Sequence, residues 1–105
     1  MDIINRRKFQ RIDFDGQASL DFIDGKYESC QVRNISLTGL CISGCFQLNN
    51  IKNCFVTIFH SEKTGDNCLK AFAQVVWKND QAIGLKFTGM TLENYELLQA
   101  TLAKK

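Results

Sequence analysis

Residues 71–87, AFAQVVWKNDQAIGLKF, show most directly how this chain folds. Every second residue in each half of this stretch is small or apolar, and polar residues stand between the halves. The alternating positions are Ala71, Ala73, Val75 and Trp77 in the first half and Ile83, Leu85 and Phe87 in the second. A period of two is typical of a strand that buries one face, and Asn79-Asp80 is typical of a turn. The stretch therefore predicts a β-hairpin whose alternating residues, Trp77 included, face the interior.

Four further runs rich in β-branched and aromatic residues precede this hairpin, at residues 18–23, 27–35, 40–46 and 54–60. Residues of these kinds favour strands. Asp24-Gly25 separates the first two runs and indicates a tight hairpin turn in which both central residues take positive φ. Glycines mark other turns, and the chain contains no proline. With the hairpin, these runs predict six antiparallel strands.

The pattern becomes helical after Thr91, a residue type that favours the N-cap position. Glu93 in the first turn and Lys104-Lys105 after the last turn both favour the helix dipole. The apolar residues at helical spacing are Leu92, Tyr95, Leu98 and Leu102. We expect this helix to pack its apolar stripe over one open end of the sheet. The predicted fold is mainly β, a six-stranded antiparallel β-barrel with a C-terminal α-helix, in which closure removes exposed edges.

The chain has 105 residues, of which 45% are hydrophobic and 23% charged, a composition typical of one globular domain. Its net charge of +2 is too small for binding to bulk nucleic acid, which requires many phosphate contacts. No apolar run approaches the length that spans a bilayer, and no apolar stretch follows the charged N-terminus as in a signal peptide. We therefore expect a cytoplasmic protein with no membrane insertion and no nucleic-acid partner.

The five cysteines are an odd number, which without a signal peptide indicates free thiols in a reducing compartment. Cys41 and Cys45 lie four residues apart and His60 is the single histidine, whereas a structural zinc site usually has two close pairs of ligands. We expect no metal site, and cysteines that pack as small buried hydrophobes. The sequence also contains no recognisable hydrolase, zinc-protease or phosphate-loop motif, so we expect no catalytic residues and no enzyme.

Two segments stand out as candidate binding residues, and the first lies just before the predicted barrel. It places Arg6, Arg7 and Arg11 within six residues, with Lys8 among them. Guanidinium groups bind phosphate oxygens, stack on aromatic rings and pair with the O6 and N7 acceptors of guanine. Taken alone, such a cluster is more often a solvated group of charges than a binding site.

The second segment is the string NISLTG at residues 34–39, where the second strand runs into a turn. The Asn34 amide and the Ser36 hydroxyl offer hydrogen-bond donors and acceptors, and Gly39 can take positive φ and lets a ligand approach the backbone. Taken alone, the string is also a common turn in which Asn and Ser bond their own backbone. Together, the two segments suit an anionic ligand that carries purine rings.

In this order, and within a six-strand pattern, the two segments resemble the motifs of the PilZ domain family, the bacterial receptor module for cyclic di-GMP. Arg7 and Arg11 match the family's RxxxR motif, which a further arginine, Arg6, precedes. Residues 34–39 match the [D/N]xSxxG motif, and residues 83–87, IGLKF, resemble the family's closing strand. The resemblance covers nearly the whole chain and implies the same barrel with a C-terminal helix.

The resemblance implies a ligand-gated switch with no cofactor other than its ligand, cyclic di-GMP. Arg7 and Arg11 would hold the phosphates and guanine edges, and Arg6 would contact a base and favour an intercalated ligand dimer. Residues 1–11 would form a flexible N-terminal segment ahead of a PilZ-like domain at 12–105. The ligand would draw this segment onto the barrel, and the new surface would be recognised by an effector protein in trans.

The second motif would complete the site. Asn34 would bond a guanine edge, Ser36 a phosphate or nearby backbone, and Gly39 would shape the turn. Asn34 stands where the family more commonly has Asp, so a charge-assisted acceptor is lost and we expect a lower affinity.

Two other interpretations stay open. One is an interaction adaptor of the same fold that does not bind nucleotide. The other is a small β-barrel that binds single-stranded RNA, which would require aromatic platforms interleaved with basic residues. The compact basic cluster and the predicted burial of most aromatic residues favour the cyclic di-GMP receptor over both.

Overall fold

The computed structural model describes residues 12–23, 25–44, 46–47, 52–60 and 68–103. Seven strands precede one helix in the chain. The strands are β1 (Ile12–Asp13), β2 (Gly16–Phe22), β3 (Gly25–Ile35), β4 (Gly39–Ser43), β5 (Asn53–His60), β6 (Cys68–Lys78) and β7 (Ala82–Gly89). Every pairing between them is antiparallel.

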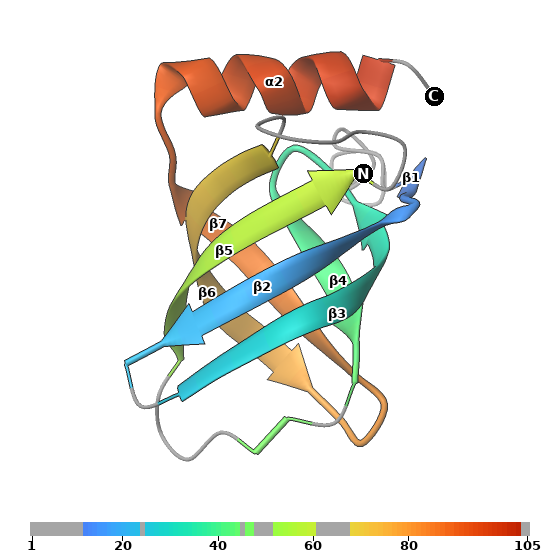
Figure 1. Ribbon diagram of the computed structural model, residues 1–105, viewed down its shortest axis with the longest axis vertical. Helices are drawn as coiled ribbons and strands as arrows, with labels where there is room; N and C mark the ends of the chain where they lie inside the picture. The colour runs from blue at the N-terminus through green and yellow to red at the C-terminus, as the bar shows by residue number, and fades with distance from the viewer. Residues whose placement is uncertain (1–11, 24, 45, 48–51, 61–67, 104–105) are drawn as a thin grey trace, which may run out of the picture.

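Six of these strands close into a barrel (Figure 1). Around the barrel they follow the order β3-β2-β5-β6-β7-β4, and a further pairing of β3 with β4 joins the two ends of the sheet. The expected six-stranded antiparallel β-barrel is therefore confirmed. Closure leaves these strands without an open edge, which removes a template for pairing with another chain.

Strand β1 adds a short seventh segment that the sequence pattern does not predict. Ile12 pairs with Ile35 and Asp13 with Asn34, so β1 continues the line of β2 along β3. The chain kinks between the two strands, where the Phe14 ring lies close over Gly16, a position with no room for a Cβ atom. Ile12, the first described residue, thus lies beside the end of β3.

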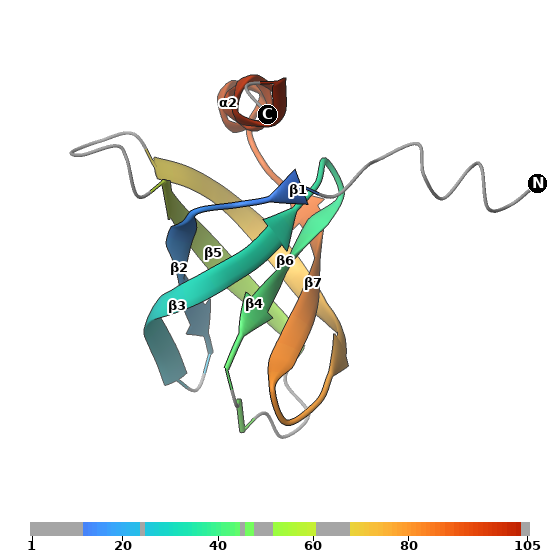
Figure 2. The same ribbon diagram turned by 90° about the vertical axis from the view of Figure 1, so that its right-hand side faces the viewer.

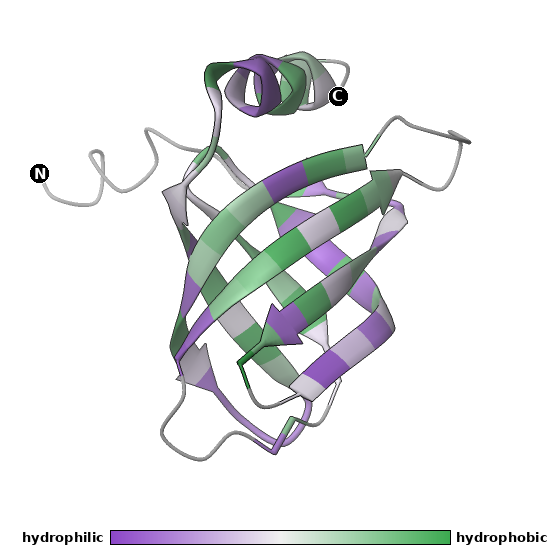
Figure 3. Cartoon of the chain, turned by 60° about the vertical axis from the view of Figure 1, so that its left-hand side comes forward, coloured by the Kyte–Doolittle hydropathy of each residue, from purple (hydrophilic) through white to green (hydrophobic). Residues whose placement is uncertain are grey.

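The interior is filled by every second residue of the strands, as the alternation of apolar and polar residues in Figure 3 shows. Side chains that are almost completely buried come from all six barrel strands, and they include Leu20, Val32, Leu40, Ile42, Val56, Ala73, Ile83 and Leu85. Such burial stabilises the fold by roughly 25 cal/mol per Å² of apolar surface removed from water. The core is therefore the barrel interior itself.

The turn between β2 and β3 lies one residue earlier than expected. Phe22 pairs with Gly25, so Gly25 is already a strand residue, and it does not have positive φ. The observed register places the Tyr27 ring edge-on to Phe22 and Phe46, with ring centroids 6.0 and 5.0 Å apart. We attribute the shift to this aromatic cluster, because packing of large rings outweighs the weaker preference of a turn dipeptide.

Helix α2 (Leu92–Ala103) lies across one end of the barrel, as Figures 1 and 2 show from two sides. Thr91 caps it, since the backbone N–H of Asn94 donates to Thr91 Oγ1 at 3.1 Å. The Oδ1 atom of Asn94 in turn accepts from the backbone N–H of Lys70 at 2.9 Å, which ties the helix to β6. The predicted C-terminal helix is confirmed, whereas Lys104 and Lys105 lie outside the described residues.

The apolar stripe of α2 is narrower than expected. Leu98 is completely buried and Leu102 packs against the core, but Leu92 is 71% exposed and Tyr95 is 37% exposed. The helix crosses only the barrel's end, so a single row of its side chains reaches the interior. Among the described residues, no helix is long and apolar enough to cross a membrane.

Candidate ligand-binding site

The turn after β3 is held by the backbone and hydroxyl of Ser36. The Ser36 N–H donates to the Gly39 carbonyl at 2.8 Å, and the Thr38 N–H donates to Ser36 Oγ at 3.2 Å. The same hydroxyl lies 3.1 Å from Thr38 Oγ1 and 3.4 Å from the Gly39 carbonyl oxygen. Ser36 is completely buried. Its hydroxyl is thus engaged within the turn, the pattern by which serine shapes a local backbone.

Gly39 is a glycine because a neighbouring strand approaches it closely. A Cβ atom there would overlap the Leu85 carbonyl oxygen of β7 and lie 3.1 Å from the Cα of Lys86. The turn is bonded to the same strand, since the Phe87 N–H donates to the Thr38 carbonyl at 2.8 Å. Positive φ is not the reason, because Gly44 is the glycine that takes it among the described residues.

Asn34 lies on the outer face of the barrel, half-buried between two strands. It pairs with Asp13 of β1 on one side and with Cys41 of β4 on the other. Its neighbour Ile35 is completely buried, and alternation along a strand turns adjacent side chains to opposite faces. The second motif therefore has two parts: the Asn34 side chain, which points outward, and the turn formed by residues 36–39.

Next to Asn34, a row of small residues runs from strand to strand on the outer surface of the barrel. Cys41 pairs with Gly84 of β7, and Gly84 pairs with Trp77 of β6. A Cβ atom at Gly84 would overlap the indole ring of Trp77, so the ring lies directly against this glycine. The small side chains of Cys41 and Gly84 therefore leave the outer face shallow beside Asn34, and the Trp77 ring borders this shallow area on the far side.

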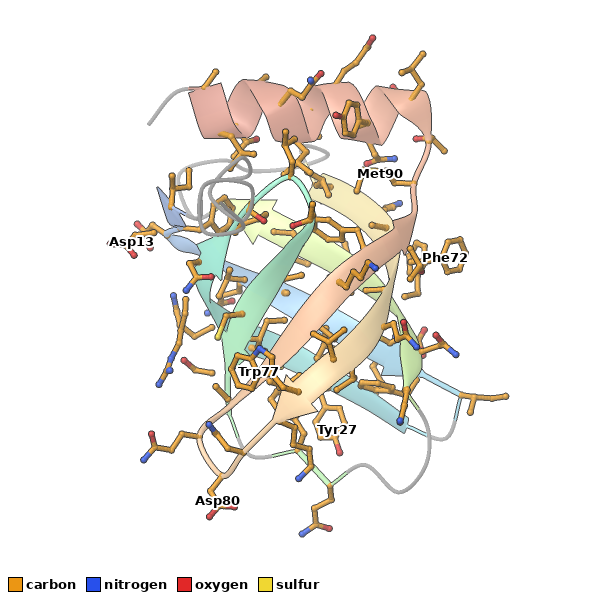
Figure 4. All side chains as sticks on the ribbon, turned by 180° about the vertical axis from the view of Figure 1, so that it is seen from behind. Asp13, Tyr27, Phe72, Trp77, Asp80 and Met90 are labelled. Carbon is orange, nitrogen blue, oxygen red and sulfur yellow. The ribbon has the colours of Figure 1, made fainter. Side chains whose placement is uncertain are left out.

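The position of Trp77 differs from the sequence-based expectation. Its side chain is 41% exposed and lies on the outer surface, where Figure 4 labels it, and not in the core. The pairing shifts between Val75 and Trp77, so one extra residue, Val76, is inserted into β6. Such a bulge breaks the two-residue alternation and turns the following side chain to the other face. The glycine opposite Trp77 was the signal in the sequence that could have indicated a ring on the outside.

Two cationic side chains flank this row. Lys86 is exposed and stands opposite Gly39 on β7. Arg33 precedes Asn34 at an irregularity of β3, and its Nε–H donates to Ser43 Oγ at 2.8 Å. An outer face with an amide, an aromatic ring and two cations can hold a ligand that is both anionic and aromatic.

The cysteines give no sign of a reactive or metal-binding centre in the part of the chain that the structure describes. Cys41 and Cys54 are buried, and Cys30 and Cys68 are half-buried free thiols. Burial raises the pKa of the Cys30 thiol, and burial together with the Asp21 carboxylate raises the pKa of Cys54 to about 12. No group of metal-ligating side chains occurs among the described residues. Cys45 lies outside them.

The three arginines of the first motif, Arg6, Arg7 and Arg11, also lie outside the described residues. The structure instead describes where their segment enters the barrel. Ile12, which follows Arg11 in the chain, pairs with Ile35, the residue between Asn34 and Ser36. Ile12, the first described residue, therefore lies beside the second motif.

Comparison with solved structures supports the same architecture. The inhibitor of motility MotI/DgrA of Bacillus subtilis superposes with a TM-score of 0.72 at 16% identity, over 94% of this chain and 50% of that one. An uncharacterized Legionella protein, Lpg0364, superposes with a TM-score of 0.58 at 15% identity, over 90% of both chains. At these identities the likeness is one of fold, and the chain spans half the length of the Bacillus protein.

The sequence itself decides the family. No curated protein matches it at a significant level. The PilZ domain matches residues 5–104, a range that contains both motifs, all the described strands and the helix. The chain belongs to the PilZ domain family.

Proposed function

We propose that this protein is a receptor that binds cyclic di-GMP on the outer face formed by β3, β4, β7 and the end of β6 that carries Trp77, and that it signals to a partner protein. PilZ domains are receptor and adaptor modules, and the family match includes both motifs of this chain. The observation that carries the proposal is the pairing of β1 with β3. It places Ile12, the residue that follows the arginine motif in the sequence, beside Ile35, which lies between Asn34 and Ser36.

Chain geometry limits how far the arginines can be from the site. Consecutive Cα atoms are about 3.8 Å apart, and an extended chain spans at most about 3.6 Å per residue. The Cα of Arg11 is thus one residue from Ile12, and those of Arg7 and Arg6 are at most about 18 and 22 Å away. Long guanidinium side chains on such a tether can reach Asn34 and the adjoining row without any rearrangement of the barrel.

The proposed roles follow from chemistry. Arg6, Arg7 and Arg11 hold the phosphates and guanine edges, and the Asn34 amide bonds a guanine edge. Trp77 offers a ring on which a base stacks, a contact worth about 1–3 kcal/mol per base.

Ser36 and Gly39 contribute differently in this proposal. The Ser36 hydroxyl is buried and already bonded within the turn, and Gly39 is packed against β7. We therefore assign both residues to building the turn that presents Asn34.

Signalling requires that the bound state offer a surface that the free state lacks. Ordering a backbone residue costs roughly 1–2 kcal/mol, which charge-assisted bonds and stacking to the ligand must exceed. In this proposal residues 1–11 become ordered over the ligand, and an effector protein recognises the covered face. The similar Bacillus protein is named an inhibitor of motility, so an effect on motility is the first output to test.

Calorimetric titration of the full chain with cyclic di-GMP tests the proposal, with GTP and cyclic AMP as control ligands. We expect saturable binding to the wild type. Arg7→Ala or Arg11→Ala should each lose ten- to a hundredfold in affinity, since one bidentate arginine–guanine pair contributes about 1–3 kcal/mol. Lys26→Ala, an exposed charge on β3 away from the turn, should bind normally.

Absence of heat above the controls at high micromolar ligand would overturn the receptor assignment and favour an adaptor that does not bind nucleotide. Equal loss of folding and binding in the arginine variants would instead show that the arginines are structural. Thermal melting of the same samples separates these outcomes.

A further inference from the structure

Asp13 is an exposed acid beside Asn34 that has no role in the function proposed above. The two residues pair across β1 and β3, directly after the pair of Ile12 with Ile35. Ile35 is completely buried and Ile12 packs against the core, so that pair faces inward. Alternation along a strand then turns Asp13 and Asn34 to the outer face, and Figure 4 shows Asp13 pointing away from the barrel. A carboxylate and an amide therefore lie side by side.

The Asp13 carboxylate is close enough to Asn34 for one flat ligand group to contact both. Residues directly opposite each other in an antiparallel pair have Cβ atoms roughly 4.5–5.5 Å apart. Asp13 is exposed, and it makes no ion pair or side-chain hydrogen bond in the part of the chain that the structure describes. Both of its carboxylate oxygens can therefore accept hydrogen bonds from a ligand.

The pair is chemically complementary to one edge of guanine. That edge carries two adjacent donors, N1–H and the 2-amino group, and next to them the acceptor O6. A carboxylate accepts from both donors at once, whereas a neutral amide has a single acceptor oxygen. The Asn34 amide has N–H donors that suit O6. Asp13 and Asn34 together thus match all three groups of the guanine edge.

We propose that Asp13 determines the specificity of this site for guanine. Its carboxylate accepts from N1–H and the 2-amino group of one base of cyclic di-GMP, while the Asn34 amide donates to O6. The inference rests on the proposed function and adds the residue that distinguishes guanine from other bases. At position 34 this chain has Asn where the family more commonly has Asp, and β1 provides a carboxylate at the neighbouring position. The loss of affinity expected from Asn34 alone is then offset.

The sign of the charge effect separates this role from a general electrostatic one. Cyclic di-GMP carries two negative phosphates, so a nearby carboxylate that makes no hydrogen bond to the ligand repels it. Without such a contact, Asp13→Asn should strengthen binding. With the proposed contact, the same variant should bind cyclic di-GMP ten- to a hundredfold more weakly, because it loses hydrogen bonds to a charged acceptor.

Calorimetric titration of the full chain with cyclic di-GMP and with cyclic di-IMP provides the test. Cyclic di-IMP lacks the 2-amino groups and otherwise has the same structure. The wild type should prefer cyclic di-GMP by at least about tenfold, since a donor to the carboxylate is missing from the analogue. In Asp13→Asn this preference should shrink by at least about threefold, because the charged acceptor is gone.

Two further variants control for charge and for position. Asp15→Asn removes the same charge from an exposed residue that lies between β1 and β2, and it should keep both the affinity and the preference for cyclic di-GMP. The exchange variant Asp13→Asn/Asn34→Asp returns a carboxylate to the adjacent position. It should bind cyclic di-GMP at least about threefold more tightly than Asp13→Asn alone.

An Asp13→Asn variant that binds cyclic di-GMP as well as the wild type, or better, would overturn the role of Asp13 and leave the proposed function standing. So would an unchanged preference over cyclic di-IMP, or an exchange variant that recovers no affinity. A wild type that binds neither ligand would overturn the proposed function and this inference with it. Thermal melting of each variant ensures that a loss of binding is not a loss of fold.

Discussion

Gly39→Ala should destabilise the whole barrel, because there is no room for a methyl group between β4 and β7. The new Cβ atom would overlap the Leu85 carbonyl oxygen and lie 3.1 Å from the Cα of Lys86. Both are backbone atoms of a paired strand, which cannot rotate aside as a side chain can. Overpacking costs about 1–3 kcal/mol in adaptable cores, so we expect a loss of about 3 kcal/mol here. In a domain of this size that lowers the melting temperature by roughly 12–24 °C.

Thermal melting followed by circular dichroism measures this effect, and Gly25→Ala is its matched control. A Cβ atom at Gly25 would have nothing within 4 Å, and the residue does not have positive φ. The control should be unchanged or more stable by up to about 1 kcal/mol, because alanine restricts the unfolded chain. A Gly39→Ala variant that melts with the wild type would refute the close approach of β7 as the reason for glycine.

Three further predictions concern single side chains. Ser36→Ala should lower the free energy of unfolding by about 1–3 kcal/mol in urea titrations, since it removes the acceptor of the Thr38 N–H; an unchanged midpoint would contradict the bonded turn. Trp77→Ala should weaken cyclic di-GMP binding in calorimetry by about tenfold, with Trp77→Phe close to wild type, if the ring is a stacking platform; equal affinities would exclude that role. Burial and the Asp21 carboxylate raise the pKa of Cys54 from 9.0 to about 12, so the unfolded chain releases this proton first and stability falls as pH rises across that interval. In denaturant melts at alkaline pH, the free energy of unfolding of Cys54→Ala should fall less steeply with pH than that of the wild type. Identical slopes would contradict the raised pKa.

The barrel could be predicted because its strands are long enough to show a period of two, and the helix because its cap and spacing are local. Strand β1 could not be predicted in this way. Ile12 and Asp13 are too few residues to show any period, and their strand conformation comes from pairing with β3. An element defined only by its partner leaves no pattern of its own in the sequence.

Trp77 shows a second limit of pattern-based reasoning. Alternation along residues 71–77 predicts a buried ring, and it holds for Ala71 and Ala73, which are 1% exposed. One inserted residue at Val76 reverses the faces beyond it. A bulge depends on how two strands pair, so it cannot be derived from the periodicity of one strand. In this chain, that insertion decides whether an aromatic ring strengthens the core or lies beside the candidate ligand.

The residues of the NxSxxG motif have two different roles, building the turn and presenting a side chain on the outer face, and a sequence match does not distinguish them. Ser36 and Gly39 are buried and build the turn, so their presence follows from the fold alone. Asn34 lies on the outer face, where it pairs with Asp13 of β1. The turn residues therefore support the family assignment, whereas a claim of ligand binding has to rest on Asn34 and the arginines. For this reason the strongest evidence for a receptor would be an arginine variant that melts like the wild type and no longer binds.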